Sequence, residues 1–150
     1  MTFPPAVRLH DFYQDQRDTA GGLPPRSVFS LSAMQARGVA ANMYILSPID
    51  GGRDWVYRLI GTGICHRYRE DRSWQTLRAF LSEENAERII ALNNEIARSG
   101  EPRFFNLLPR EIYLDWLTLE TMSLPILSND RSEVWLLGGT FFSDEHGPDA

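Results

Sequence analysis

The sequence is poor in cysteine, and all 15 of its basic residues are arginine. The single cysteine, Cys65, excludes a disulfide bond within the chain, which is typical of proteins in a reducing compartment. No window approaches the roughly 18 consecutive apolar residues that span a membrane. The amino-terminal residues MTFPPAVRLH lack the basic start and apolar core of a signal peptide. We therefore expect a cytoplasmic protein without a membrane segment.

The charge of the chain excludes another group of partners. A net charge of −5 and a pI near 5.2 provide no basic surface for nucleic acid or for anionic lipid. The three histidines, His10, His66 and His146, are dispersed and lack the spacing of metal ligands, so we predict no metal site. A chain of 150 residues indicates one domain that needs no metal or disulfide for its stability.

Apolar periodicity predicts an amphipathic helix over residues 7–18, where Leu9, Phe12 and Tyr13 recur at helical spacing. The sequence TAGGLPPRS breaks this helix, and a second short helix is expected over residues 31–40. We divide the chain into an amino-terminal helical extension (residues 1–22), a domain (residues 23–143) and a polar tail (residues 144–150).

Two strands are predicted over residues 42–49 and 55–61, joined by the turn Asp50-Gly51-Gly52-Arg53. Strand alternation would place Trp55, Tyr57 and Leu59 on one face and Val56, Arg58 and Ile60 on the other.

The rest of the chain predicts helices followed by strands. Short helical pieces over residues 63–81 precede a long helix, Glu83–Ser99, which Ser82 caps and Gly100 ends. Three strands are then expected over residues 102–108, 113–127 and 134–142. Short turns favour antiparallel pairing, so the fold class is α+β, an antiparallel sheet with flanking helices.

Five segments, in order along residues 23–142, resemble the PAS domain family, in particular the compact single-domain PAS proteins of proteobacteria. They are LPPRSVFSLSAM, YILSPIDGGRDWVYRLIGTGI, SGEPRFFN, LETMSLPILS and VWLLGGTFF. The resemblance implies a PAS-like five-stranded antiparallel sheet that curls around helices and often encloses a small-ligand pocket. The chain departs from the family where Arg69-Glu70-Asp71-Arg72-Ser73-Trp74 replaces a glycine-containing turn.

This resemblance implies a sensory or protein-interaction module that works through a protein partner or a homodimer. The helix over residues 7–18 cannot bury its apolar side alone. Leu9, Phe12 and Tyr13 would pack on the sheet or on the same helix of a second chain, and the resemblance favours the second chain. Candidate pocket residues are Tyr44, Tyr57, His66, Phe104, Trp116 and Met122, although sequence alone does not separate a pocket from a filled core.

Family cofactors have little support in the residues. The flavin-linked cysteine motif has an asparagine where Ile64 stands, and the long helix has no histidine for haem, which leaves only His66. The cofactor is therefore unknown. Gly61-Thr62-Gly63 lacks the third glycine of a dinucleotide fingerprint, since that position is His66, and we interpret it as a tight strand-to-helix turn.

Other polar groups allow two interpretations each. Arg67, Arg69 and Arg72 form either a solvated surface with Glu70 and Asp71 or a mouth that attracts an anionic ligand. Cys65 beside His66 points about 100° away from it on a helix and is typical of a small buried side chain.

We do not expect an enzyme. The alternative is a small α+β pocket enzyme of isomerase or cyclase type, with His66 and Asp115 as its candidates, or a ligand-free scaffold with a filled core. Asp115 and Glu120 would face opposite sides of one strand, which argues against a two-carboxylate hydrolase. Glu120 would be either a residue of the solvent face or a buried group bonded to the helical layer.

Overall fold

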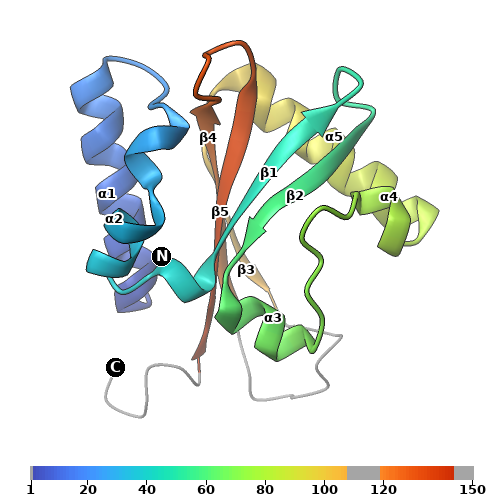
Figure 1. Cartoon of the computed structure of the whole chain (residues 1–150), viewed down its shortest axis with the longest axis horizontal. Helices are drawn as coiled ribbons and strands as arrows, with labels where there is room; N and C mark the ends of the chain where they lie inside the picture. The colour runs from blue at the N-terminus through green and yellow to red at the C-terminus, as the bar shows by residue number, and fades with distance from the viewer. Residues whose placement is uncertain (1, 108–118, 144–150) are drawn as a thin grey trace.

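The computed structural model describes residues 2–107 and 119–143 and combines helices with one sheet (Figure 1). Its helices are α1 (Pro4–Ala20), α2 (Leu31–Ala36), α3 (Thr62–Tyr68), α4 (Leu77–Phe80) and α5 (Glu83–Ser99), with short 3₁₀ helices η1 (Arg26–Phe29) and η2 (Ala40–Asn42). The strands are β1 (Met43–Ile49), β2 (Asp54–Ile60), β3 (Arg103–Leu107), β4 (Leu119–Leu127) and β5 (Val134–Phe142). The predicted residues 113–118 and the tail 144–150 lie outside the described residues.

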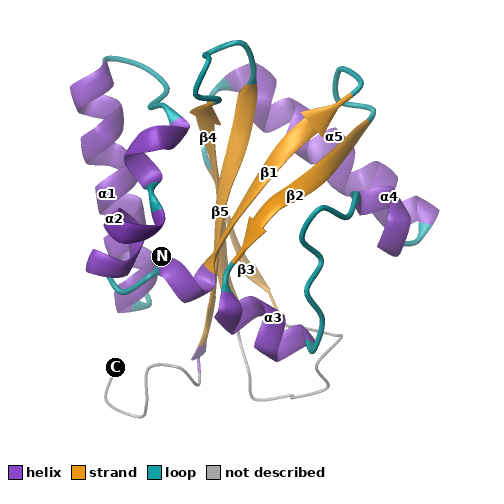
Figure 2. Ribbon diagram, viewed as in Figure 1, coloured by secondary structure: helices purple, strands orange, loops and turns teal. Residues whose placement is uncertain are grey.

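The strands form one five-stranded sheet in the order β2-β1-β5-β4-β3, and every neighbouring pair is antiparallel. Helices α3, α4 and α5 separate the first two strands from the last three along the chain. Helices α1 and α2 lie on one side of the sheet and α4 and α5 on the other (Figure 2). The predicted α+β class, with a five-stranded antiparallel sheet, flanking helices and an amino-terminal helix, is confirmed.

The side of the sheet that carries α1 is a filled hydrophobic core, which we call the α1 face. Ala6, Leu9, Phe12 and Tyr13 of α1 are all buried there, together with Phe29, Met34, Ile45, Leu124, Ile126, Leu137 and Phe141. The Tyr13 hydroxyl donates a hydrogen bond to the Pro125 carbonyl oxygen at 2.6 Å, and burial raises the pKa of Tyr13 to about 12. The one polar group that Tyr13 brings into this core is therefore satisfied.

This burial corrects the prediction that Leu9, Phe12 and Tyr13 form a dimer face. Their exposed fractions are 0%, 6% and 0%, because α1 packs its apolar side on β4 and β5 of the same chain. Of the two sequence alternatives, folding back on the sheet is the one that the structure adopts. A second copy of the chain would have to contact other residues.

Glu120 fastens the start of α1 to the sheet. This side chain is 3% exposed and accepts hydrogen bonds from the backbone N–H groups of Thr2 (2.7 and 2.8 Å) and Phe3 (3.1 and 3.0 Å), and from the Thr2 hydroxyl. Burial acts to raise the pKa of Glu120, but these hydrogen bonds outweigh it and lower the pKa below the ordinary value. Glu120 is thus a buried group bonded to the helical layer, and its assignment to the solvent face is wrong.

The other side of the sheet, the α5 face, has a smaller core of Leu46, Trp55, Leu77, Ala86, Ile90, Ile96 and Leu136. Helix α5 begins and ends as predicted, because the Ser82 hydroxyl accepts from the Asn85 N–H and Gly100 has the left-handed φ of 68°. Asn94 fixes the helix to the strands: it accepts from Trp55 Nε1 at 3.0 Å and donates to the Gly52 carbonyl at 2.9 Å.

Two adjacent glycines of β5 let side chains approach the sheet closely from both faces. A Cβ atom on Gly138 would lie 1.8 Å from the Tyr44 ring on the α5 face. A Cβ atom on Gly139 would lie 2.6 Å from the Leu9 side chain on the α1 face. Because Gly138 and Gly139 have no side chain, Tyr44 and α1 can pack directly against the backbone of β5, the middle strand.

A bulge in β2 changes which side chains share a face. Leu46 pairs with Tyr57 and Ile45 pairs with Leu59, so Arg58 has no partner residue across the strands. Trp55 and Tyr57 lie on the α5 face as predicted, but Leu59 packs against the α1 face, and its assignment with them is wrong. The bulge also carries Ile60 to the α5 face.

Candidate functional site

A cavity of about 1020 Å³ lies on the α5 face, between the sheet and helices α3, α4 and α5. Its aromatic lining residues are Tyr44, Tyr57, Tyr68, Phe80 and Phe105. Its aliphatic lining residues include Ile60, Ile64, Leu77, Leu81, Ile89 and Leu92. The cavity has the size and the mainly apolar walls of a small-molecule site.

The aromatic side chains form a connected wall from the sheet to α4. The Tyr44 and Tyr57 rings meet edge to face with centroids 5.8 Å apart, and Tyr57 stacks on Phe80 at 5.9 Å. The Arg72 guanidinium lies 4.0 Å from the centroid of the Phe80 ring. Flat faces of this kind favour a planar or aromatic ligand.

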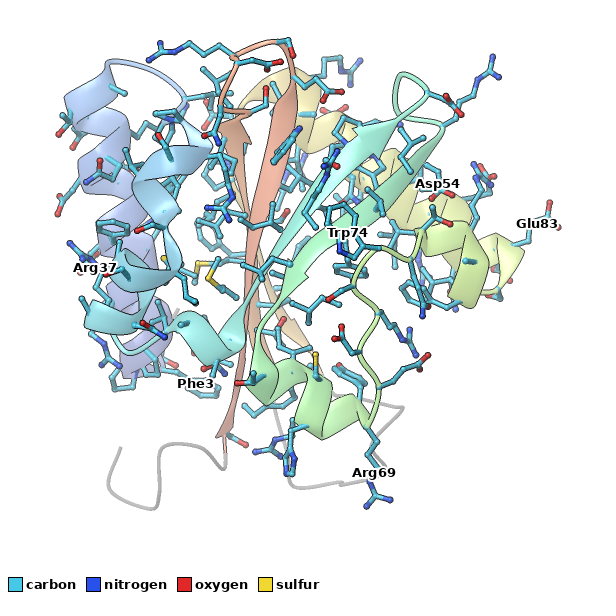
Figure 3. All side chains as sticks on the ribbon, viewed as in Figure 1. Phe3, Arg37, Asp54, Arg69, Trp74 and Glu83 are labelled. Atoms are coloured by element: carbon cyan, nitrogen blue, oxygen red, sulfur yellow. The ribbon has the colours of Figure 1, made fainter. Side chains whose placement is uncertain are left out.

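The segment before α4 is held against the free edge of β2. The Trp74 N–H donates to the Tyr57 carbonyl at 2.7 Å, and the Tyr57 N–H donates to the Gln75 carbonyl at 3.2 Å. Trp74 has a φ of 66° and a side chain that is 65% exposed in front of the strands (Figure 3). These bonds cover the edge strand and place the Arg72 side of the cavity.

Polar groups occur at a few places on the sheet wall. The Thr121 hydroxyl donates to the Gly139 carbonyl at 2.9 Å and lies 3.3 Å from the Thr140 hydroxyl. Burial raises the pKa of Tyr44, while a hydrogen bond with Thr121 acts in the opposite direction. Tyr44 therefore stays a neutral phenol at physiological pH.

Asn93 is the polar group of the helix wall. It is 5% exposed and lines the cavity, and its Nδ2 has no hydrogen-bond partner among the described residues. A buried amide without a partner is destabilising, and native structures contain few of them. Its neighbour Asn94 makes two hydrogen bonds, so the contrast lies between adjacent positions of one helix.

Three charged residues line the rim of the cavity. Arg72 forms an ion pair with Glu70 at 3.2 Å, so these two side chains neutralise each other. Arg88 donates to the Asn85 carboxamide at 2.9 Å and has no carboxylate partner within the described part of the chain. Among the described residues, the rim thus carries one positive charge, Arg88, without a counter-charge.

The cavity brings together some of the predicted pocket residues. Tyr44 and Tyr57 line it, and Met122 borders it while belonging to the core of the α1 face. Phe104 does not line the cavity, because strand alternation turns it to the α1 face. There it is 44% exposed, and its ring centroid lies 5.2 Å from that of the His10 ring. Phe105 lines the cavity instead. Trp116 lies outside the described residues.

His66 is also separate from this cavity, because it lines a surface hollow with Arg67 and Arg69. The predicted arginine cluster is therefore divided. Arg67 lies 4.6 Å from the Phe142 ring, Arg69 ends α3, and only Arg72 reaches the cavity.

The Gly61 region is a turn, as the sequence predicts. Gly61 precedes α3, and a Cβ atom there would lie 2.3 Å from the Ala41 carbonyl oxygen, so a side chain would not fit. Burial raises the pKa of the Cys65 thiol, with Asp71 acting in the same direction, which opposes formation of a reactive thiolate. Asp115, the other enzyme candidate, lies outside the described residues.

The sequence interpretation missed Asn93, Phe80, Phe105 and Arg88 as site residues. One signal could have identified Asn93, which falls three residues after Ile90 and three before Ile96 in the apolar stripe of α5. A polar residue inside an apolar stripe indicates a buried amide that requires a partner. Phe105 pairs with Thr121 across the ladder and Phe104 pairs with Met122, so the strand register is what places Phe105 in the cavity lining.

Comparison with known proteins adds no family assignment. No model of a protein family matches the chain, and no similar curated protein was found. Within residues 2–107 and 119–143, no helix combines the length and apolar character that crossing a bilayer requires. Over the same residues, no three His, Cys, Asp or Glu side chains gather as metal ligands would.

Proposed function

We propose that this protein is a PAS-like sensory module of the cytoplasm that binds a small molecule on the α5 face and signals through a protein partner or a second copy. The observation that carries the proposal is the cavity of about 1020 Å³ lined by Tyr44 and Tyr57. Ligand pockets span roughly 300–1,000 Å³, with apolar walls and a few polar groups that orient the ligand. Asn93, Thr121 and Arg88 are such groups.

The cavity favours a ligand-binding module over a scaffold with a filled core, for which we expected no space of ligand size. It also favours binding over catalysis, because no candidate catalytic residue of the sequence analysis lines it within the described residues. His66 belongs to the hollow with Arg67 and Arg69. We therefore propose a binding function without turnover.

Signal output in this proposal is a population shift. A ligand that prefers one packing of α3, α4 and α5 on the sheet would bias the surface that these helices present to a partner. The buried side of α1 does not provide that surface, because Leu9, Phe12 and Tyr13 pack within the chain.

Native mass spectrometry of the purified protein tests this function. We expect a non-covalent small-molecule adduct, either as purified or after incubation with a cell extract of small molecules. Leu92→Trp, which places a bulky indole inside the cavity, should displace the adduct. Ala91→Trp is the matched control, because Ala91 is exposed on the same helix and should leave the adduct unchanged.

Two results would contradict the proposal. One is the absence of any adduct under both conditions. The other is an adduct that persists in Leu92→Trp while the variant remains folded by circular dichroism. The same spectra report the oligomeric state, and thus whether a second copy is present.

A further inference from the structure

We infer that the cavity on the α5 face takes an elongated aromatic carboxylate that carries a hydrogen-bond acceptor partway along its length. This inference rests on the proposed function and names the ligand class for the same site. It combines three features of the wall: an unsatisfied buried donor, an uncompensated positive charge at the rim, and an aromatic surface between them.

The hydrogen-bond acceptor of the proposed ligand is inferred from Asn93. Asn93 lines the cavity, and its Nδ2 is buried without a hydrogen-bond partner among the described residues. Leucine has nearly the same size and would complete the apolar stripe of α5 without an unsatisfied amide. A carbonyl, ether or similar oxygen on the ligand would satisfy Nδ2, so the amide is explained by what it binds.

The carboxylate of the proposed ligand is inferred from Arg88. The other charged residues of the described lining, Arg72 and Glu70, neutralise each other across 3.2 Å. On helix α5, Glu87 pairs with Arg78 and Glu95 pairs with Arg98. Arg88 donates to the neutral Asn85 carboxamide and has no carboxylate partner among the described residues. A carboxylate accepts two parallel hydrogen bonds from a guanidinium, which makes it the matching group.

The helix geometry sets the order of these groups along the ligand. Asn93 follows Arg88 by five residues, which is about 7.5 Å along the axis of α5. Five residues also turn about 140° around the helix. The two side chains therefore reach the cavity from different directions, and a ligand that meets both carries its carboxylate and its oxygen acceptor at least about one aromatic ring apart. Beyond the acceptor, the rings of Tyr44, Tyr57 and Phe80 offer flat surfaces for a second apolar group.

Three model compounds separate the contributions of these groups. 4-Benzoylbenzoate carries a carboxylate, a ketone and two rings. 4-Benzylbenzoate lacks only the ketone oxygen, and 4-methylbenzophenone lacks only the carboxylate. Isothermal titration calorimetry should give the tightest binding for 4-benzoylbenzoate, with each of the other two weaker by tenfold or more.

Substitution of Asn93 or Arg88 should weaken the binding of only those compounds that carry the group which that residue contacts. Asn93→Leu should weaken 4-benzoylbenzoate about tenfold and leave 4-benzylbenzoate unchanged, while raising the thermal midpoint of the ligand-free protein. Arg88→Gln should weaken both carboxylates and leave 4-methylbenzophenone unchanged. Arg98→Gln makes the same charge change on an exposed part of α5 and should alter none of the three affinities.

Equal affinity for the three compounds, or no effect of Arg88→Gln and Asn93→Leu on the matching compound, would overturn the ligand class. Absence of binding by all three compounds would overturn it as well. If native mass spectrometry still finds another molecule that Leu92→Trp excludes, the binding function stands and only the class is wrong. If neither experiment finds a ligand, both proposals fall together.

Discussion

The two faces of the sheet are built from the same strands but are closed in different ways. On the α1 face, four buried side chains of one helix interlock with the strands, and the buried groups Tyr13 and Glu120 have hydrogen-bond partners. On the α5 face, the helices leave a cavity of about 1020 Å³, and the Asn93 amide nitrogen has no partner in the part of the chain that the structure describes. Under the proposed function, the filled α1 face supplies most of the stability and the α5 face holds the ligand.

The difference between the two faces is tested most directly by the same leucine-to-alanine substitution on each face. Leu9→Ala removes a fully buried side chain of α1 and leaves a void in a filled core, so it should cost about 3 kcal/mol. Leu92→Ala removes a half-buried side chain that already borders open space, and about 1 kcal/mol is expected. Urea unfolding followed by circular dichroism measures both free energies.

Because both changes are leucine to alanine within a helix, helix propensity cancels between them. Equal losses on the two faces would show that the α5 face is as tightly packed as the α1 face. The comparison would then fail, and so would the assignment of binding to the α5 face.

A second prediction concerns the hydrogen bonds that Glu120 accepts on the α1 face. Glu120→Gln removes the charge that accepts from Thr2 and Phe3 and should cost about 2 kcal/mol at neutral pH. Because the folded state lowers the pKa of Glu120, its contribution is present above the ordinary carboxyl pKa and is lost as the pH falls through the lowered value.

Urea unfolding at a series of acidic pH values measures this effect. The stability difference between the wild type and Glu120→Gln should shrink as the solution becomes more acidic. A difference that is independent of pH would mean that Glu120 contributes through shape and not through its charge.

The smallest expected effect is at the border of the α5 face. Arg69 ends α3 with a φ of 55°, a left-handed conformation that costs about 1 kcal/mol for a residue with a side chain. Arg69→Gly should therefore stabilise the fold by up to about 1 kcal/mol. Because the Arg69 side chain is exposed, the substitution tests the backbone conformation of this residue (Figure 3).

Arg67→Gly is the control of opposite expected sign. Arg67 has helical backbone angles inside α3, so glycine should destabilise the fold by about 1 kcal/mol or more, since it also removes the contact with the Phe142 ring. Thermal or urea unfolding gives the sign of both changes. A loss of stability in Arg69→Gly would indicate that the Arg69 side chain, and not its backbone, holds this border.

Much of the fold could be predicted because it follows from local chemistry. Ser82 and Gly100 mark the ends of α5 through a cap and a left-handed turn, which are properties of single residues. The bulge at Arg58 could not be predicted in the same way. Strand alternation assumes an uninterrupted ladder, and one unpaired residue moves Leu59 to the opposite face.

The site was predicted less completely because it depends on contacts between distant segments. Tyr44 and Tyr57 lie on correctly placed strands, whereas Phe104 and Phe105 differ by one position and only the strand register separates them. The sequence left Glu120 either on the solvent face or buried, because its hydrogen-bond partners Thr2 and Phe3 are 118 and 117 residues away along the chain. The family resemblance remains a prediction.

Gly138 and Gly139 leave adjacent positions of β5 without a side chain on either face of the sheet. With Tyr44 resting on one side of this dipeptide and Leu9 on the other, only a layer of main chain separates the cavity lining from the amino-terminal helix. A displacement of the tyrosine ring would press on β5 without a side chain to absorb it. A side chain at either glycine would therefore have to move Tyr44 or Leu9 away from the sheet.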